Sequence, residues 1–184
     1  MTLSLETLNY LQEEQKKLDI FIHQQNKLEM KDTFFLRKIA LLVEIGEAAN
    51  ELKSFKYWKK DKNINLEKSQ EELIDCLHFF LSLANCSRID FNEYFSPETE
   101  KNLNKNKILL TIFRITTKLR WPKEPKEKIR EREEKKTKSE KFYYYWWLSI
   151  FEKLCQQIDF DEKKLLETYN RKNKDNRQRQ LDNY

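Results

Sequence analysis

Two pairs of acidic side chains interrupt otherwise apolar stretches of this sequence. Glu44 and Glu47 lie near the end of the run FFLRKIALLVEIGEAANEL, and Glu72 and Asp75 lie in EELIDCLHFFLSLAN. Residues three apart on a helix share one face, about one turn apart. Carboxylates beside a protein core are costly unless a positive charge compensates them. Each pair is therefore expected to have a cationic partner.

The chemistry that suits such a set of carboxylates is metal-assisted reaction at a phosphate. Only a short connector separates the two segments, so their helices are expected to be antiparallel neighbours whose acidic faces meet. Converging carboxylates raise one another's pKa values, and a divalent cation removes that repulsion. Oxygen ligands favour Mg²⁺ or Mn²⁺ over zinc. A bound ion would hold substrate phosphates, and one carboxylate would act as general base for an attacking water.

The alternative interpretation is that both pairs are ordinary solvated helix faces. One such pair alone would carry little weight, but two pairs beside apolar stripes on adjacent helices favour the metal site. Gly46, the only glycine in the chain, lies inside the first pair. A glycine weakens a helix and is better tolerated where something approaches the backbone closely.

The elements that position these residues are expected to be helices. One glycine and three prolines among 184 residues disfavour the turns of β proteins and the glycine loops of nucleotide-binding α/β folds. Apolar residues recur at helical spacing along the chain. The sequence predicts an all-α bundle of five to six helices in a single domain, 1–184. The expected helices cover about residues 4–25, 33–53, 66–86, 97–119, 142–158 and 161–170.

Several helix ends and faces have sequence signals of their own. Ser96 followed by Pro97 predicts the start of the fourth helix, and Asp159 with Glu162 fits a capping box for the last one. The charged segment 123–141 is expected to be a solvated linker or an exposed helix. The aromatic run FYYYWWLSIF is interpreted as a buried helix rather than a dimer surface. The inward face of the second helix is expected to consist of Leu36, Ile39, Ala40 and Val43.

Charge and composition limit the function further. The net charge of +5 is modest, so no nucleic-acid partner is expected. Three cysteines without metal-type spacing fit free thiols in a reducing compartment. No segment approaches the ~18 apolar residues of a membrane span, and the N-terminus lacks the apolar core of a signal peptide. These features predict a soluble, cytoplasmic protein.

The acidic segments resemble those of a known family. LLVEIGEAANELKSFKYWKK, followed by EELIDCLHFFLSLAN, is similar to the dimeric all-α dUTPases of bacteria, phages and trypanosomatids, within the all-α nucleoside triphosphate pyrophosphatase superfamily that includes MazG. That family also has a late K-N-x-x-N-x-x-R-Q-x-x-x-Y pattern. The residues that match it here are Lys172, Asn173, Asn176, Arg179, Gln180 and Tyr184. Together the matches cover roughly residues 8–86 and 160–184.

The resemblance implies hydrolysis of dUTP, with dUDP as a further candidate substrate, to dUMP by a homodimer that uses two or three Mg²⁺ ions, with Mn²⁺ as a possible substitute. It implies that the metal ligands are Glu44, Glu47, Glu72 and Asp75. Of these, Glu47 is preferred over Glu44 as the catalytic base. The groups implied to hold the phosphates are Lys172, Asn176, Arg179 and Tyr184. The residues implied to line the nucleoside site are Gln15, Asp19, Trp58, His78 and Phe79.

Within the nucleoside set, Asp19 departs from the family, which usually has asparagine at the matching position, and this departure bears on the choice of base. Phe79 is implied to exclude a ribose 2′-hydroxyl. Residues 96–158 are implied to form a variable, mobile helical region, and residues 170–184 a tail that closes over substrate. Some phage members of the family are bound by repressors, so a protein partner of that type is also a candidate.

Two other functions remain open at the level of sequence. One is a related pyrophosphatase with another base preference, such as dCTP or a modified nucleotide. The other is a helical module without enzymatic activity that binds nucleic acid through its basic stretches.

Overall fold

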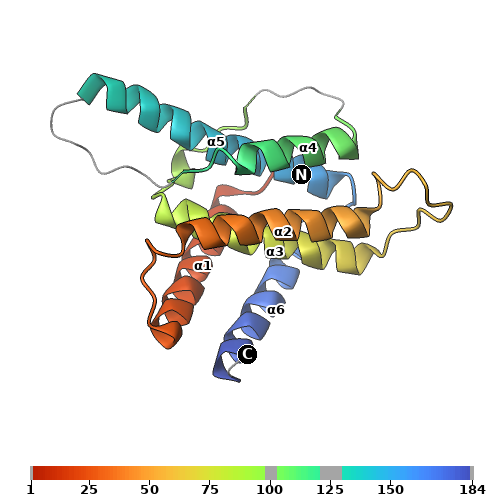
Figure 1. Ribbon diagram of the computed structural model, residues 1–184, viewed down its shortest axis with the longest axis horizontal. Helices are drawn as coiled ribbons and strands as arrows, with labels where there is room; N and C mark the ends of the chain where they lie inside the picture. The colour runs from red at the N-terminus through yellow and green to blue at the C-terminus, as the bar shows by residue number, and fades with distance from the viewer. Residues whose placement is uncertain (1, 98–102, 121–129, 183–184) are drawn as a thin grey trace.

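The computed structural model describes residues 2–97, 103–120 and 130–182, with side chains in the last range from residue 141 onward. Its elements are helices throughout, and no strand occurs among these residues (Figure 1). The helices are α1 (Leu5–Asn26), α2 (Phe34–Leu52), α3 (Leu66–Cys86), α4 (Lys105–Thr116), α5 (Arg130–Gln156) and α6 (Glu162–Leu181), with one 3₁₀ turn, η1 (Phe91–Glu93). The predicted all-α fold is confirmed.

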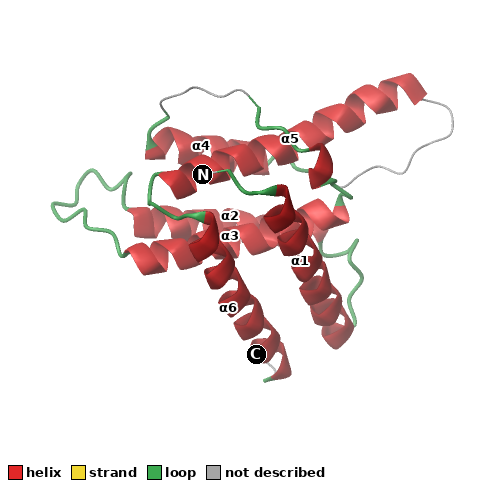
Figure 2. Ribbon diagram, turned by 180° about the vertical axis from the view of Figure 1, so that it is seen from behind, coloured by secondary structure: helices red, strands yellow, loops and turns green. Residues whose placement is uncertain are grey.

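The centre of the molecule is the pair of neighbouring helices α2 and α3. Figures 1 and 2 show α4 and α5 on one side of this pair, while α1 and α6 project from the other side. Residues 53–65 connect α2 and α3, which run antiparallel side by side (Figure 1), so the acidic segments lie on adjacent helices. In the part of the chain that the structure describes, no helix is long and apolar enough to cross a bilayer.

The inward face of α2 differs from the predicted one. Leu36, Ile39 and Val43 are 63%, 58% and 51% exposed, while Ala40 is half-buried. The side chains that face the core are Phe34, Arg37, Leu41, Ile45, Ala48, Ala49 and Leu52. Both sets satisfy helical periodicity because α2 is apolar on two faces, and the stripe that is buried contains a charged residue, Arg37. The hydrophobic pattern alone therefore could not select the correct face.

Most of the aromatic run of α5 is buried, as predicted, while Phe142 is exposed. Trp147 stacks on Phe80 of α3 with ring centroids 4.0 Å apart and planes 8° apart. Its indole Nε1–H donates a hydrogen bond to Thr116 Oγ1 at 2.9 Å, which satisfies its only polar group. Tyr144 and Phe151 of the same helix are also fully buried. These contacts join α3, α4 and α5 in one core.

Two predicted helix starts are wrong. In α4, the Asn104 side chain accepts the amide hydrogen of Lys107, whereas Ser96 instead shares a hydrogen bond with Ser149 at 2.8 Å. The helix therefore begins at Lys105, and the rest of the expected first turn, residues 98–102, lies outside the described residues. In α6 the N-cap is Asp161, which accepts from Lys164 N–H at 2.8 Å.

The expected capping box does not form, because Asp159 precedes the helix and Glu162 bonds to Ser4. Asp159 lies in the left-handed region, with φ 50°, before the helix starts. Glu162 accepts hydrogen bonds from the backbone N–H and the hydroxyl of Ser4, which ties α6 to the start of α1. The helix also continues to Leu181, past the predicted end near residue 170, so the described part of the expected tail is helical.

These caps lead to a prediction about stability. Asp161→Ala should lower the free energy of unfolding by about 1 kcal/mol because the first turn of α6 loses its side-chain acceptor. Asp159→Gly should change it by less than about 0.5 kcal/mol, since relief of the left-handed backbone offsets the entropy of glycine in the unfolded chain. Urea unfolding of the two variants measures both values. A larger loss for Asp159→Gly than for Asp161→Ala would contradict the observed cap.

Candidate active site

Three of the four predicted metal ligands converge between α2 and α3. Glu44, Glu72 and Asp75 each offer one carboxylate oxygen, and these oxygens lie within 4.8 Å of one another. All three side chains are half-buried. Hard oxygen donors at this separation suit a divalent cation such as Mg²⁺. The residues present therefore fit the metal that the sequence predicts.

The electrostatics of this cluster show the repulsion expected without a cation. Burial, followed by the charges of Asp75, Glu47 and Glu72, raises the pKa of Glu44 to about 7. Burial and the charge of Asp75 also raise the pKa of Glu72. Glu47 is exposed and does not belong to the close trio, but its charge contributes to both shifts, so it lies near them. The cluster stores repulsion that a positive charge would relieve.

One positive charge already reaches the cluster from α6. Lys172 Nζ lies 2.5 Å from Asp75 Oδ2, and both side chains are largely shielded from solvent. Burial raises the pKa of Asp75, and the Lys172 hydrogen bond and charge oppose that rise. Arg179 also lowers the pKa of Asp75 through its charge. The late basic motif of the sequence is thus placed beside the acidic pairs.

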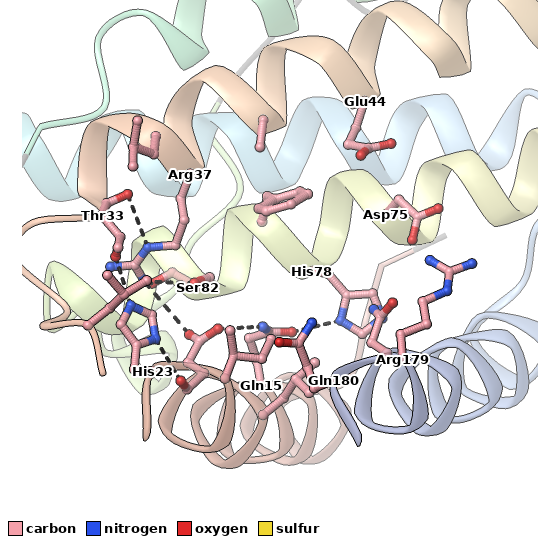
Figure 3. A pocket seen from close by; sticks show the side chains of 18 residues that line it. Gln15, His23, Thr33, Arg37, Glu44, Asp75, His78, Ser82, Arg179 and Gln180 are labelled. Carbon is pink, nitrogen blue, oxygen red and sulfur yellow. Dashed lines mark hydrogen bonds and ion pairs between the residues drawn. The ribbon is translucent and has the colours of Figure 1, made fainter. Parts of the chain in front are cut away.

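A pocket of about 460 Å³ opens next to the carboxylates and is lined by α1, α2, α3 and α6 (Figure 3). This volume falls within the range of small-molecule sites. Its predicted lining residues are Gln15, Asp19, Glu44, Asp75, His78, Phe79, Asn176 and Arg179. Because Glu44 and Asp75 belong to both features, the acidic cluster and the pocket form one continuous site.

A buried hydrogen-bond network sets the polar groups of the pocket. Gln15 Nε2 donates to Asp19 Oδ1 at 2.8 Å, and the Tyr169 hydroxyl donates to Gln15 Oε1 at 3.0 Å. His78 Nδ1 lies 2.7 Å from the same Gln15 oxygen, which can only accept, so Nδ1 carries the proton. Burial lowers the pKa of His78 to about 3, which keeps the ring neutral. Its Nε2 is then a buried acceptor without a hydrogen-bond partner among the described residues.

Trp58, which was expected to contact the nucleoside, does not line the pocket. Trp58 lies on the connector between α2 and α3, 60% exposed, in edge-on contact with Phe55 and Tyr57. Tyr184 lies outside the described residues. The close approach expected at Gly46 is also not made by the described part of the chain, since a Cβ built there would meet no atom within 4 Å.

Five polar residues that line the pocket were not predicted as site residues from the sequence. They are His23, Thr33, Arg37, Ser82 and Gln180. A signal was present for Arg37, which occupies a buried position of α2 at the spacing of Phe34, Leu41 and Ile45. A cation on an apolar stripe requires a buried acceptor, and that requirement could have pointed to the pocket.

The geometry is that of an all-helical pocket with an acidic cluster at one end and buried polar side chains, among them His78 and the Asp19–Arg37 pair, at the other. The family model described as dUTPase matches residues 7–184, so the chain belongs to the all-α dUTPase family. Its activity is that of a dUTP diphosphatase. No curated protein matches the chain. The family generally depends on Mg²⁺, in agreement with the acidic cluster.

The raised pKa of Glu44 predicts an unusual dependence of stability on pH. The pKa of Glu44 is about 7 in the folded protein and near 4.5 in the unfolded chain. Between these pH values the folded state therefore binds more protons than the unfolded state. Stability of the metal-free protein contributed by this group should therefore fall as pH rises from about 4.5 to about 7. Thermal unfolding in the presence of a chelator measures this trend.

Glu44→Gln should remove the part of the fall in stability between pH 4.5 and 7 that Glu44 causes, because the amide does not ionise. Glu13→Gln, on the exposed face of α1, is the matched control and should retain the wild-type trend. If wild type and Glu44→Gln show parallel melting temperatures across this range, Glu44 does not carry the shift.

Proposed function

We propose that Glu44, Glu72 and Asp75, together with Glu47, hold Mg²⁺ and that the adjoining pocket holds the deoxyuridine part of dUTP. The observation that carries this proposal is the continuity of the acidic cluster with the pocket, because a nucleoside triphosphate needs both environments in one site. Two or three ions, or Mn²⁺ in their place, would neutralise the phosphate charges and lower the pKa of an attacking water.

The phosphate chain is proposed to lie along α6. Lys172, Asn176 and Arg179 recur at helical spacing on that helix; Lys172 contacts Asp75, and the other two line the pocket. Ammonium, amide and guanidinium groups donate hydrogen bonds to phosphate oxygens. Tyr184 is proposed to add a hydroxyl beyond the end of α6. This arrangement would let one helix cover the phosphates while α2 and α3 hold the metal.

The nucleoside is proposed to contact α1 and α3. His78 Nε2 is a buried acceptor without a hydrogen-bond partner among the described residues. A hydroxyl of the sugar could donate to it. Phe79 lines the pocket beside it and would leave no space for a 2′-hydroxyl. Gln15 fixes the orientation of both His78 and Asp19 through its amide.

Glu47 is the proposed general base. Its carboxylate is exposed at the edge of the cluster and close enough to raise the pKa values of Glu44 and Glu72. A water that attacks the α-phosphorus would pass its proton to Glu47, and pyrophosphate would leave. The other three carboxylates would hold the metal during this step.

A panel of deoxynucleoside triphosphates with Mg²⁺ tests this assignment. We expect dUTP to be the preferred substrate, and Glu47→Gln to lower kcat about 100-fold or more with little change in KM, because proton removal is lost while binding remains. Pyrophosphate release measures both. Glu51→Gln, one turn further along α2 and paired with Lys68 on the surface, should keep wild-type kinetics. Faster turnover of dCTP than of dUTP would overturn the proposed preference for uracil. Full activity of Glu47→Gln would exclude Glu47 as the general base.

A homodimer is proposed through the outer face of α2. Phe35, Leu36, Ile39 and Val43 form an apolar strip along one side of this helix, and all four are more than half exposed. A contiguous apolar surface of this kind marks an interaction site more often than free surface. A second copy of the chain fits as the occupant because the family that the sequence resembles is dimeric and the strip is long enough for helix packing.

Ile39→Glu tests the dimer. The charge at the centre of the strip should convert dimers to monomers, because it would be buried without a partner in the interface. Light scattering coupled to size exclusion gives the mass in solution. Leu110→Glu, at a 71% exposed position on another helix, α4, should leave the mass unchanged. A dimer that survives Ile39→Glu but not Leu110→Glu would place the interface on α4.

A further inference from the structure

Lys172 is a counter-ion that the protein itself supplies to the acidic cluster. Its Nζ lies 2.5 Å from Asp75 Oδ2, and the two side chains are only 15% and 20% exposed. The charge of Lys172 also lowers the pKa values of Glu44 and Glu72. One ammonium group therefore acts on all three carboxylates whose oxygens lie within 4.8 Å of one another.

This ammonium competes with the metal that the cluster is proposed to hold. A divalent cation on Asp75 would share that carboxylate with a hydrogen-bonded positive charge from Lys172. Like charges repel strongly at such a short separation, and the partial burial of the pair limits screening by water and salt. A metal ion would therefore bind Asp75 more tightly once its ion pair with Lys172 has broken.

Other contacts hold α6 in place beside α3 and α1. Arg171 pairs with Glu71 of α3 at 2.7 Å, and the Tyr10 hydroxyl of α1 donates a hydrogen bond to Asn170 at 2.9 Å. Neither contact needs the ammonium of Lys172. A lysine ammonium lies at the end of a flexible four-carbon chain, so it can change its partner while its helix stays where it is.

The proposed phosphate chain offers this ammonium a second partner. Asn176 and Arg179 follow Lys172 on α6 at helical spacing, so the three side chains share one face of the helix. Asn176 and Arg179 both line the pocket. An ammonium that leaves Asp75 therefore remains on the face of α6 along which the phosphates are proposed to lie.

We infer that Lys172 is an exchangeable counter-ion, which neutralises the cluster while the site is empty, leaves Asp75 when a divalent cation binds, and then donates to the phosphate chain. This inference rests on the proposed metal and phosphate positions. Lys172 then opposes binding of the cation alone, since the ion pair must break first. It also makes cation and phosphate bind cooperatively, because the cation releases the ammonium that the phosphate accepts.

The first test measures binding of Mn²⁺ to the nucleotide-free protein by electron paramagnetic resonance, which detects the free ion. Lys172→Met should lower the Kd for Mn²⁺ about tenfold, the effect of removing one charge-assisted hydrogen bond that competes with the metal. Lys172→Arg should stay nearer to the wild-type Kd because it keeps the positive charge.

The second test measures binding of pyrophosphate at saturating Mg²⁺ by calorimetry. Lys172→Met should raise the Kd for pyrophosphate about tenfold, because the phosphate oxygens lose an ammonium donor. The two effects thus have opposite signs. A lysine that only supports the fold would weaken binding of both ligands, and a lysine that only binds phosphate would leave the Kd for Mn²⁺ unchanged. Either result overturns the inference.

Arg171→Met is the matched control, because it removes the neighbouring cation of α6 from a carboxylate outside the cluster. It should change each Kd by less than about twofold. Asp75→Asn tests the metal site separately and should weaken binding of Mn²⁺ strongly. Binding of Mn²⁺ that Asp75→Asn abolishes and Lys172→Met leaves unchanged overturns the inference but supports the metal site. A wild-type protein that binds no Mn²⁺ overturns both.

A measurement on the wild type keeps the inference testable if Lys172→Met does not fold. Acetylation of lysine amines, quantified by mass spectrometry, reports how accessible each amine is. Acetylation of Lys172 should rise when Mg²⁺ is added and fall again when pyrophosphate is added with it. Lys174, exposed on the same helix, is the internal control and should react equally in all three states. Acetylation of Lys172 that Mg²⁺ does not change overturns the inference.

Discussion

Repulsion among carboxylates between α2 and α3 is the constraint on which the rest of the site depends. Packing these two helices side by side brings Glu44 against Glu72 and Asp75, where burial raises all three pKa values and the neighbouring carboxylates of the cluster raise those of Glu44 and Glu72 further. The structure meets part of this cost with Lys172 from α6. The helix that supplies that ammonium also closes one side of the pocket, so charge compensation and pocket formation follow from the same contact.

The end of the pocket away from the acidic cluster contains buried hydrogen-bond acceptors. His78, Gln15 and Asp19 form a buried chain of hydrogen bonds. His78 Nε2 has no hydrogen-bond partner among the described residues, and Asp19 Oδ2 is paired only at 3.9 Å with the Arg37 guanidinium. Buried polar groups are normally satisfied in folded proteins. A site with surplus acceptors is suited to a ligand that brings donors, while the acidic end is suited to a cation and the phosphates that it binds. The polarity of the pocket fits the proposed placement of a nucleotide along it.

Local patterns predicted some elements well and others poorly, for identifiable reasons. The spans of α1, α2 and α3 and the burial of the α5 aromatics were predicted because strong periodicity and large apolar side chains leave little choice. The inward face of α2 was wrong because both of its faces are apolar, and the caps of α4 and α6 were wrong because several neighbouring residues can accept the same amide hydrogen. The Lys172 motif was recognised, but its position within a continuous helix was not.

The sequence by itself determined the helical class, the spacing of the acidic pairs and the identity of the late basic motif, because each depends on residues close together in the chain. Only the tertiary structure decided that Asp75 meets Lys172, that Trp58 lies apart from the pocket, and that Asp19 faces Arg37. Those relations join residues on different helices, and they depend on how α1, α2, α3 and α6 rotate and cross as they bury their apolar faces. Helical periodicity constrains each helix separately and leaves that rotation open.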